Sequence, residues 1–342
     1  MASSGVVIFP AGRLFSISLA PAVAENASVI ERTHVDIRPF HDADAVAATN
    51  LFRLLVPDFV LTPPALLQWM QTMPDEAHPR FWVAETAGEV VGSAEAFLNW
   101  RTQESGIASL WSGVLPHARR QGIGSRLYDL AETHFRAHGA RRIETSVVDE
   151  DGRRFAERRG FVHSRTERFS ALDPRTVDLS ELRRLAEEKA EEGFRLATLR
   201  EVLHEQRELY TLWQEAAADM PRDDPTQPQP YDEWRERVLG NPLLDLDASA
   251  VVLAGERPAS FAWLAVDPEG RRAAHTLTGT ARAFRGHNLA RLAKLAGIAR
   301  CAEHGIDLLV TSNDSANAAM LAINTRLGYR PTIEHLTMTR GL

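Results

Sequence analysis

The sequence has 342 residues, which is long enough for two domains. Its composition, with 44% hydrophobic and 25% charged residues, is that of an ordinary globular protein, and the net charge of −7 gives no reason to expect nucleic acid or an anionic membrane as a partner. The single cysteine, Cys301, excludes an internal disulfide framework and favours a reducing compartment, so we predict a cytoplasmic protein.

The first 33 residues are largely apolar, but Pro10, Gly12 and Pro21 interrupt them too often for a membrane span. A signal peptide is the alternative, because residues 22–24 (AVA) resemble a small-residue cleavage site; no basic segment precedes the apolar stretch, however. We therefore predict that residues 1–33 are an N-terminal extension, which we expect to be disordered, and we predict no membrane contact.

The first half of the chain predicts an α/β domain over residues 34–172. Hydrophobic periodicity and turn residues predict a mixed sheet with helices on its faces. The predicted strands are 35–39, 81–86, 89–99, 108–115, 142–148 and 161–170, and the predicted helices are 42–55, 64–72, 124–138 and 151–159. The highly charged segment 173–192 predicts a solvated linker helix, at which we place the domain boundary.

The second half, residues 193–342, repeats this pattern. The predicted strands are 194–199, 250–254, 260–266, 276–281 and 306–311; the predicted helices are 201–218, 231–239, one that ends at His304, and 315–326. A loop at 221–230, rich in Pro and Asp, is expected to be mobile. The stretches Arg119–Gly160 and Arg285–Gly328 each contain a loop, a helix closed by His-Gly, a strand, a short helix and a Gly-aromatic pair, which indicates a duplicated domain.

A basic, glycine-spaced loop joins a predicted strand end to a predicted helix start in the first half. Gly122 and Gly124 allow a tight turn and a close approach of the backbone to a ligand. The free N–H groups and the dipole of the helix N-terminus favour an anion there, so we predict a pyrophosphate site. An ordinary turn with a solvated basic face is the alternative. The predicted binding residues are Val114, Arg119, Arg120, Gln121, Gly122, Ile123 and Gly124.

The motif Val114-x-Pro116-x-x-Arg119-x-x-Gly122-x-Gly124 resembles the acetyl-CoA loop of the GCN5-related N-acetyltransferase (GNAT) family. In the second half, Arg285-Gly286-x-x-Leu289-Ala290 and residues 312–329 (SNDSANAAMLAINTRLGY) resemble the same family. The resemblance implies two tandem GNAT-type domains, each a twisted mixed sheet with splayed central strands, and acetyl-CoA as co-substrate. The cofactor-binding residues that it implies in the second half are Arg285, Gly286, Asn288, Leu289, Ala290 and Asn317.

The sequence departs from the family pattern at several positions. Asn288 stands where a glycine is usual, so we expect the first loop to be the better acetyl-CoA site. Many members carry an acidic Tyr four residues before the late glycine; here those positions hold Ala156 and Asn324, and Asn324 retains a hydrogen bond to offer the sulfur. Glu95 is the first candidate base, with an exposed strand residue as the alternative. His275 is the candidate in the second half, with a surface histidine as the alternative.

The resemblance implies an acetyl-CoA-dependent N-acetyltransferase, in which the primary amine of a small molecule attacks the thioester directly; we predict no metal site. One alternative is a non-catalytic acyl-CoA-binding or sensor module, because the Tyr is missing from both halves. Another is a protein-lysine or N-terminal acetyltransferase, with the loop 221–230 and the N-terminal extension meeting a protein partner. The sequence leaves open whether the protein is a monomer or a homodimer and which half is active.

Overall fold

A computed structural model describes residues 35–219 and 227–342, which divide into two compact units. The N-terminal unit comprises residues 35–57, 61–165 and 335–342; the C-terminal unit comprises 58–60 and the described part of 166–334. The predicted extension 1–33 and residues 221–226 of the predicted loop lie outside the described residues.

The N-terminal unit contains a mixed sheet with the strand order β1-β2-β3-β4-β5-β12, in which β4 and β5 are parallel. Its elements, in chain order, are β1 (Asp36–Pro39), α1 (Ala45–Leu55), α2 (Pro63–Gln71), β2 (Arg80–Thr86), β3 (Glu89–Leu98), β4 (Ile107–Val114), α3 (Ile123–Ala137), β5 (Arg142–Val147), α4 (Glu150–Glu157) and the end of β12 (Arg330–Gly341). Every strand and helix predicted for residues 34–160 is present, with ends that differ by at most three residues; the largest difference is at α1, where a 3-10 turn occupies the first three predicted positions.

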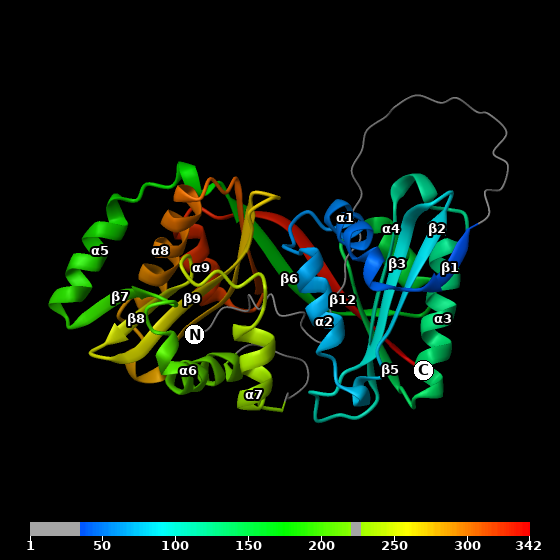
Figure 1. Ribbon diagram of the computed structural model, residues 1–342, viewed down its shortest axis with the longest axis horizontal. Helices are drawn as coiled ribbons and strands as arrows, with labels where there is room; N and C mark the ends of the chain where they lie inside the picture. The colour runs from blue at the N-terminus through cyan, green and yellow to red at the C-terminus, as the bar shows by residue number, and fades with distance from the viewer. Residues whose placement is uncertain (1–34, 220–226) are drawn as a thin grey trace. The chain divides into compact units, whose positions relative to one another are not determined.

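Different helices cover the two faces of this sheet, as Figure 1 shows for α3 on one side and α1 and α2 on the other. Ala94 of β3 packs against Ile123 and Leu127 of α3 in one apolar cluster. Phe97, three residues further along β3 and therefore on the opposite face, lies with its ring 5.7 Å from that of Trp69 of α2. The sheet thus separates an α3 face from an α1–α2 face.

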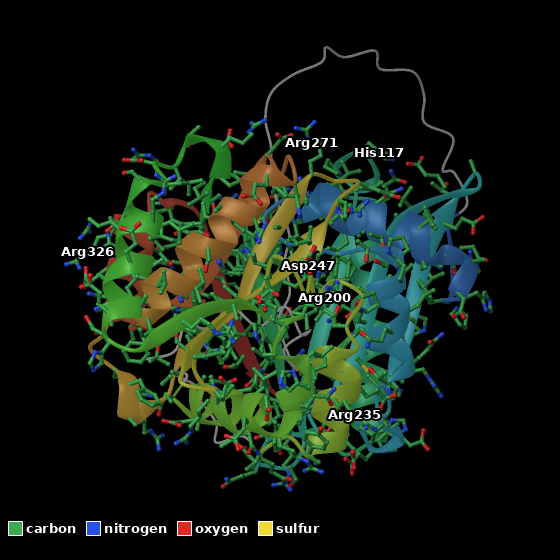
Figure 2. The ribbon with its side chains drawn as sticks, turned by 60° about the vertical axis from the view of Figure 1, so that its left-hand side comes forward. His117, Arg200, Arg235, Asp247, Arg271 and Arg326 are labelled. Carbon is green, nitrogen blue, oxygen red and sulfur yellow. The ribbon has the colours of Figure 1, made fainter. Side chains whose placement is uncertain are left out.

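The C-terminal unit repeats this plan with the strand order β6-β11-β10-β9-β8-β7. Its elements, in chain order, are β6 (Val162–Leu172), α5 (Ser180–Glu191), β7 (Phe194–Thr198), α6 (Gln206–Ala218), α7 (Tyr231–Trp234), a π-helical turn (Arg235–Leu239), β8 (Ala250–Ala254), β9 (Arg257–Asp267), β10 (Arg272–Thr280), α8 (Leu289–Glu303), β11 (Leu308–Asp314) and α9 (Ala318–Arg326). Arg200 and Asp247, labelled in Figure 2, hydrogen-bond at 2.6 Å and tie the chain after β7 to the chain before β8.

Alternating residues of β9 again face different helices. Ala262 and Leu264 belong to the apolar cluster that includes α5 and α8, whereas Phe261 and Trp263 belong to the cluster that includes α6 and α7. Within the part of the chain that the structure describes, no helix has both the length and the apolar character needed to cross a bilayer.

Each sheet receives a strand end from the other half of the sequence. Residues Glu167–Leu172 of β6 pair with β11 in the C-terminal unit. Residues Leu336–Gly341 of β12 pair with β5 in the N-terminal unit. The prediction that residues 161–170 belong to the first domain, with no strand after Tyr329, differs from this pairing, because local periodicity carries no information about which sheet a strand joins.

The charged segment 180–191 is not a solvated linker, and that prediction is wrong. Its helix, α5, places Leu182, Leu185 and Ala186 at helical spacing on one face, and Leu185 is only 3% exposed. These side chains pack into the apolar cluster beneath α8. Most charges of α5 lie on its outer face, the buried Lys189 pairs with Glu188 and Glu192, and the helix is an integral part of the C-terminal unit.

Candidate functional site

In the N-terminal unit, the two parallel strands separate along their length. The parallel ladder of β4 and β5 begins at Ile107 and, within the described chain, ends where Ser109 faces Glu144. Beyond this pair β4 continues to Val114 and β5 to Val147. We call this separation the N-terminal fork. Backbone N–H and C=O groups on its inner edges are available to a ligand because they do not bond to each other.

The loop that follows β4 is open at the corner where a phosphate would sit. Gly122 has φ +83° and caps the N-terminus of α3. A Cβ built at Gly122 meets no described atom within 4 Å. Gln121 is exposed, and Ile123 packs into the core, so only the backbone of Ile123 faces the corner. The arrangement suits an anion held by first-turn N–H groups.

The arginines of this loop contribute positive charge and also hold the loop in place through hydrogen bonds and ion pairs. Arg119 Nε donates to the carbonyl oxygen of Val114 at 3.1 Å, and its Nη1 lies 3.5 Å from Asp149 Oδ2. Arg120, which has φ +64°, pairs with Asp151 at 3.1 Å. The Arg119 side chain thus holds the loop against the strand end.

The second loop has the same backbone shape as the first. Gly286 (φ +87°) and Asn288 (φ +60°) take the left-handed conformations that Arg120 and Gly122 take in the first loop. Asn288 caps α8 as Gly122 caps α3. Asparagine adopts this conformation more readily than most residues, so the substitution leaves the loop geometry intact.

At the second loop, Arg285 makes contacts that correspond to those of Arg119 at the first loop. Arg285 Nε donates to the carbonyl oxygen of Thr280 at 3.3 Å, and its Nη2 forms an ion pair with Asp219 of the segment after α6. Leu289 is buried, and Ala290, which corresponds to Gly124, is also buried. The predicted residues of the second loop therefore lie together, as do those of the first loop, but in different units.

Glu95 lies beside the N-terminal fork on the α1–α2 face. It is the cross-strand partner of Trp111, which belongs to the separated part of β4. Glu95 is partly buried, and this burial raises the pKa of its carboxyl to about 7, although a hydrogen bond from Trp69 acts in the opposite direction. The alternative of an exposed strand residue is wrong. A carboxyl that titrates near neutral pH is suited to general-base chemistry.

The corresponding face of the C-terminal unit is apolar. β10 and β11 also run parallel and, among the described residues, their ladder ends where His275 faces Thr311; a β-bulge in β10 follows at once. We call the separation beyond this pair the C-terminal fork. Trp263 takes the place in β9 that Glu95 takes in β3, because it pairs with Leu277 of β10 as Glu95 pairs with Trp111 of β4. Phe261 and Leu277 pack beside it in the α6–α7 cluster.

His275 is not a surface residue, and that alternative is wrong. The side chain of His275 is 1% exposed and points to α8. Its Nδ1 lies 2.7 Å from the hydroxyl oxygen of Tyr329. Burial first, and the nearby charge of Lys294 second, lower the pKa of His275 well below its usual value. The ring is therefore neutral at physiological pH and faces away from the α6–α7 side.

Asn324 is part of a buried amide pair. Its Nδ2 lies 2.5 Å from Asn313 Oδ1, which leaves Asn313 Nδ2 and Asn324 Oδ1 without a hydrogen-bond partner among the described residues. If both amides are turned over, the free donor moves from Asn313 to Asn324. The pair thus offers one N–H donor in either orientation.

Asn317 caps α9 by accepting from the backbone N–H of Met320 at 3.3 Å.

Sequence reasoning missed Lys294. This residue lies in α8 and is completely buried, and its Nζ is 3.4 Å from Thr311 Oγ1 at the closed end of the C-terminal fork. The available signal was a lysine in the stretch 289–299, which is apolar apart from Arg291 and Lys294 and is buried at most of its positions.

The comparisons with known proteins agree with this geometry. A family model described as the acetyltransferase (GNAT) family matches residues 48–161. No curated protein matches the sequence. Among solved structures, a tandem GNAT protein from the clavulanic acid biosynthesis pathway is similar over 90% of this chain and 98% of its own, with 18% identity and a TM-score of 0.66. A GCN5-related N-acetyltransferase from Sphaerobacter thermophilus is similar over 92% and 97%, with 16% identity and a TM-score of 0.61. At these identities the structures show a shared fold, the tandem GNAT fold.

Proposed function

We infer that this chain, which belongs to the GNAT family of N-acetyltransferases, transfers an acetyl group from acetyl-CoA to the primary amine of a small molecule, and that its N-terminal unit carries the reaction. The observation that carries the proposal is the placement of Glu95. A carboxyl whose pKa is about 7 lies directly beside the separated part of β4, in the same unit as an open glycine loop.

In this proposal, the coenzyme and the acceptor amine approach from opposite faces of the N-terminal sheet. The loop at Gly122 belongs to the α3 face, and it receives the pyrophosphate of the coenzyme. Glu95 belongs to the α1–α2 face, so the amine approaches from that side. The fork between β4 and β5 connects the two faces, and its backbone groups are suited to hold the thioester oxygen as negative charge develops there.

Glu95 supplies the base that the amine requires. Most amines are protonated near neutral pH and are not nucleophilic in that form. The Glu95 carboxylate takes a proton from the ammonium group, and the neutral nitrogen attacks the carbonyl carbon. The carbon–sulfur bond then breaks, and the second proton lost by the nitrogen passes to the leaving thiolate, which gives the acetylated amine and free coenzyme A. Juxtaposition of the two reactants supplies much of the rate. The aromatic side chains of Trp69 and Trp111 beside Glu95 favour a small acceptor over a folded protein surface.

Acetyl transfer to a panel of small amines tests this proposal. Release of free thiol, with the acetylated product identified by mass spectrometry, is the expected result for at least one amine. If acetyl-CoA neither binds nor turns over with any amine, lysine peptide or protein N-terminus, the proposal is contradicted.

A second function, acyl-CoA binding without catalysis, is proposed for the C-terminal unit. Its second loop keeps the left-handed residues Gly286 and Asn288, which supports coenzyme binding. Its α6–α7 face, however, has Trp263 at the position of Glu95 and is packed with Phe261 and Leu277. Among the described residues of that apolar cluster, an acceptor amine has no proton acceptor.

A further inference from the structure

Lys294 is a buried lysine for which the described residues provide no counter-ion. Its side chain is fully buried, and its Nζ contacts Thr311 Oγ1 at 3.4 Å and lies 5.2 Å from the centre of the Tyr329 ring. Among the residues that the structure describes, no carboxylate pairs with Lys294. Burial alone lowers the pKa of this amine to about 7. A lysine is rarely buried completely unless something pairs with it.

The position of Lys294 connects it to the C-terminal fork. Thr311 and His275 form the last pair of the parallel ladder, so Lys294 lies at the closed end of the fork. The open end is at Thr280, five residues further along β10, which corresponds to a depth of about 16 Å. A chain that enters at the loop and runs along the fork therefore brings only its far end to Lys294.

Other polar groups near this fork also lack partners. The side-chain atoms His275 Nε2, Asn313 Nδ2 and Asn324 Oδ1 are buried and, in the described structure, form no hydrogen bond. Buried polar groups are normally paired, because each unpaired group loses its hydration without compensation. Three such atoms and an unpaired lysine in one unit indicate a site for a polar ligand.

The N-terminal unit does not repeat this arrangement. The position that corresponds to Lys294 holds Tyr128, which hydrogen-bonds to Arg340. Arg340 in turn pairs with Glu132 at 2.9 Å. Every charge in this group has a partner within the protein, so the unpaired cation is a property of the C-terminal unit.

We propose that the C-terminal unit binds a coenzyme A thioester whose acyl chain ends in a carboxylate, and that Lys294 is the counter-ion of this carboxylate at the closed end of the C-terminal fork. The proposal rests on the proposed coenzyme site of the second loop for the direction in which the ligand enters. A carboxylate fits better than a neutral group, because a charge-assisted hydrogen bond in a water-excluded site is much stronger than a neutral one. Since the described residues of the α6–α7 cluster are apolar and include no base, the unit holds this ligand rather than transferring its acyl group.

Calorimetric titration with two matched probes tests the proposal. Succinyl-CoA carries the terminal carboxylate, and butyryl-CoA has the same number of acyl carbons with a methyl group at the end. We expect the wild-type protein to contain a site that binds succinyl-CoA at least about tenfold more tightly than butyryl-CoA. Lys294→Met, which keeps the length of the side chain and removes its charge, is expected to abolish the preference and to leave butyryl-CoA binding in place.

Proton uptake gives a second readout that needs no variant. At pH 8 the free Lys294 amine is mostly neutral, and a bound carboxylate would favour its protonated form. Titrations in buffers of different ionisation enthalpy should show uptake of up to about one proton with succinyl-CoA and none with butyryl-CoA. Equal affinities for the two probes, or a preference that survives in Lys294→Met, would overturn the proposal.

The outcome is separable from that of the proposed function. Acetyl transfer without succinyl-CoA selectivity would remove this inference and leave the proposed function standing. Selective binding of succinyl-CoA in a protein that acetylates no amine would do the opposite. If Lys294→Met fails to fold, as judged by circular dichroism, the probe comparison and the proton uptake of the wild-type protein still decide the matter.

Discussion

Glu95 on β3 and Trp111 on β4 are cross-strand partners, and β4 forms one edge of the N-terminal fork. Trp263 holds the place of Glu95 in the C-terminal unit, where the described α6–α7 cluster is apolar. The two units share a strand order and a loop geometry, yet one has a carboxyl with a raised pKa beside its fork and the other has a buried lysine at the closed end of its fork. Duplication of the fold therefore does not imply duplication of the chemistry.

Glu95→Gln should stabilise the protein above neutral pH. Because the folded-state pKa of Glu95 is raised from 4.5 to about 7, the folded state binds more protons than the unfolded state between these values, and stability is lost as pH rises through that window. The substitution removes this loss, so we expect a gain of about 3 kcal/mol at most at pH 8 and little change near pH 4.5. Urea unfolding at the two pH values measures it. Glu89→Gln, at an exposed carboxyl of the same strand, should show no such difference.

Because Gly122 has a left-handed backbone conformation, we expect substitutions at this position to differ in how well they are tolerated. Gly122→Val should destabilise the protein by about 1–2 kcal/mol and weaken acetyl-CoA binding, because a β-branched residue resists positive φ. Gly122→Asn should be tolerated, since Asn288 holds the same conformation in the second loop. Thermal unfolding and calorimetric titration distinguish the pair. Equal behaviour of the two variants would contradict the account.

Much of this arrangement could be predicted from local sequence. The loop at Gly122, the repeated motif order and Glu95 all follow from residue patterns within a few positions of one another. The exchange of β6 and β12 could not be predicted, because it depends on pairing between residues far apart in the chain. The environment of Lys294 was missed for a related reason: hydrophobic periodicity reports which residues are buried, and a lysine inside an apolar helix gives no indication of what lies opposite it.

Lys294 should make the free energy of unfolding of the protein increase with pH in the alkaline range. Its folded-state pKa is lowered from 10.5 to about 7, so between these values the unfolded state binds more protons, and stability increases as pH rises. We expect Lys294→Met to remove this slope and to be more stable than the wild type at pH 7, by up to about 5 kcal/mol. Denaturant unfolding at pH 7 and pH 10 measures it. A wild-type slope that persists in the variant would show that another group is responsible.

The end of β12 should be required for the stability of the N-terminal unit. Leu336–Gly341 pair with β5, so a fragment of residues 35–172 loses the partner of that strand. We expect the fragment to exchange the backbone amides of β5 rapidly and to be protected again when a peptide of residues 330–342 is added. Hydrogen exchange measured by mass spectrometry tests this. Protection of β5 in the fragment alone, equal to that in the whole chain, would be inconsistent with the pairing.

The most direct test of the central claim is the pH dependence of acetyl transfer by the wild-type protein and by Glu95→Gln. If Glu95 is the base of the N-terminal unit, kcat/KM for an acceptor amine should rise with pH through an ionisation near 7, and the substitution should lower it by about 10²–10⁴-fold and remove that ionisation. A Glu95→Gln protein that retains the wild-type rate and the same pH profile would contradict the claim.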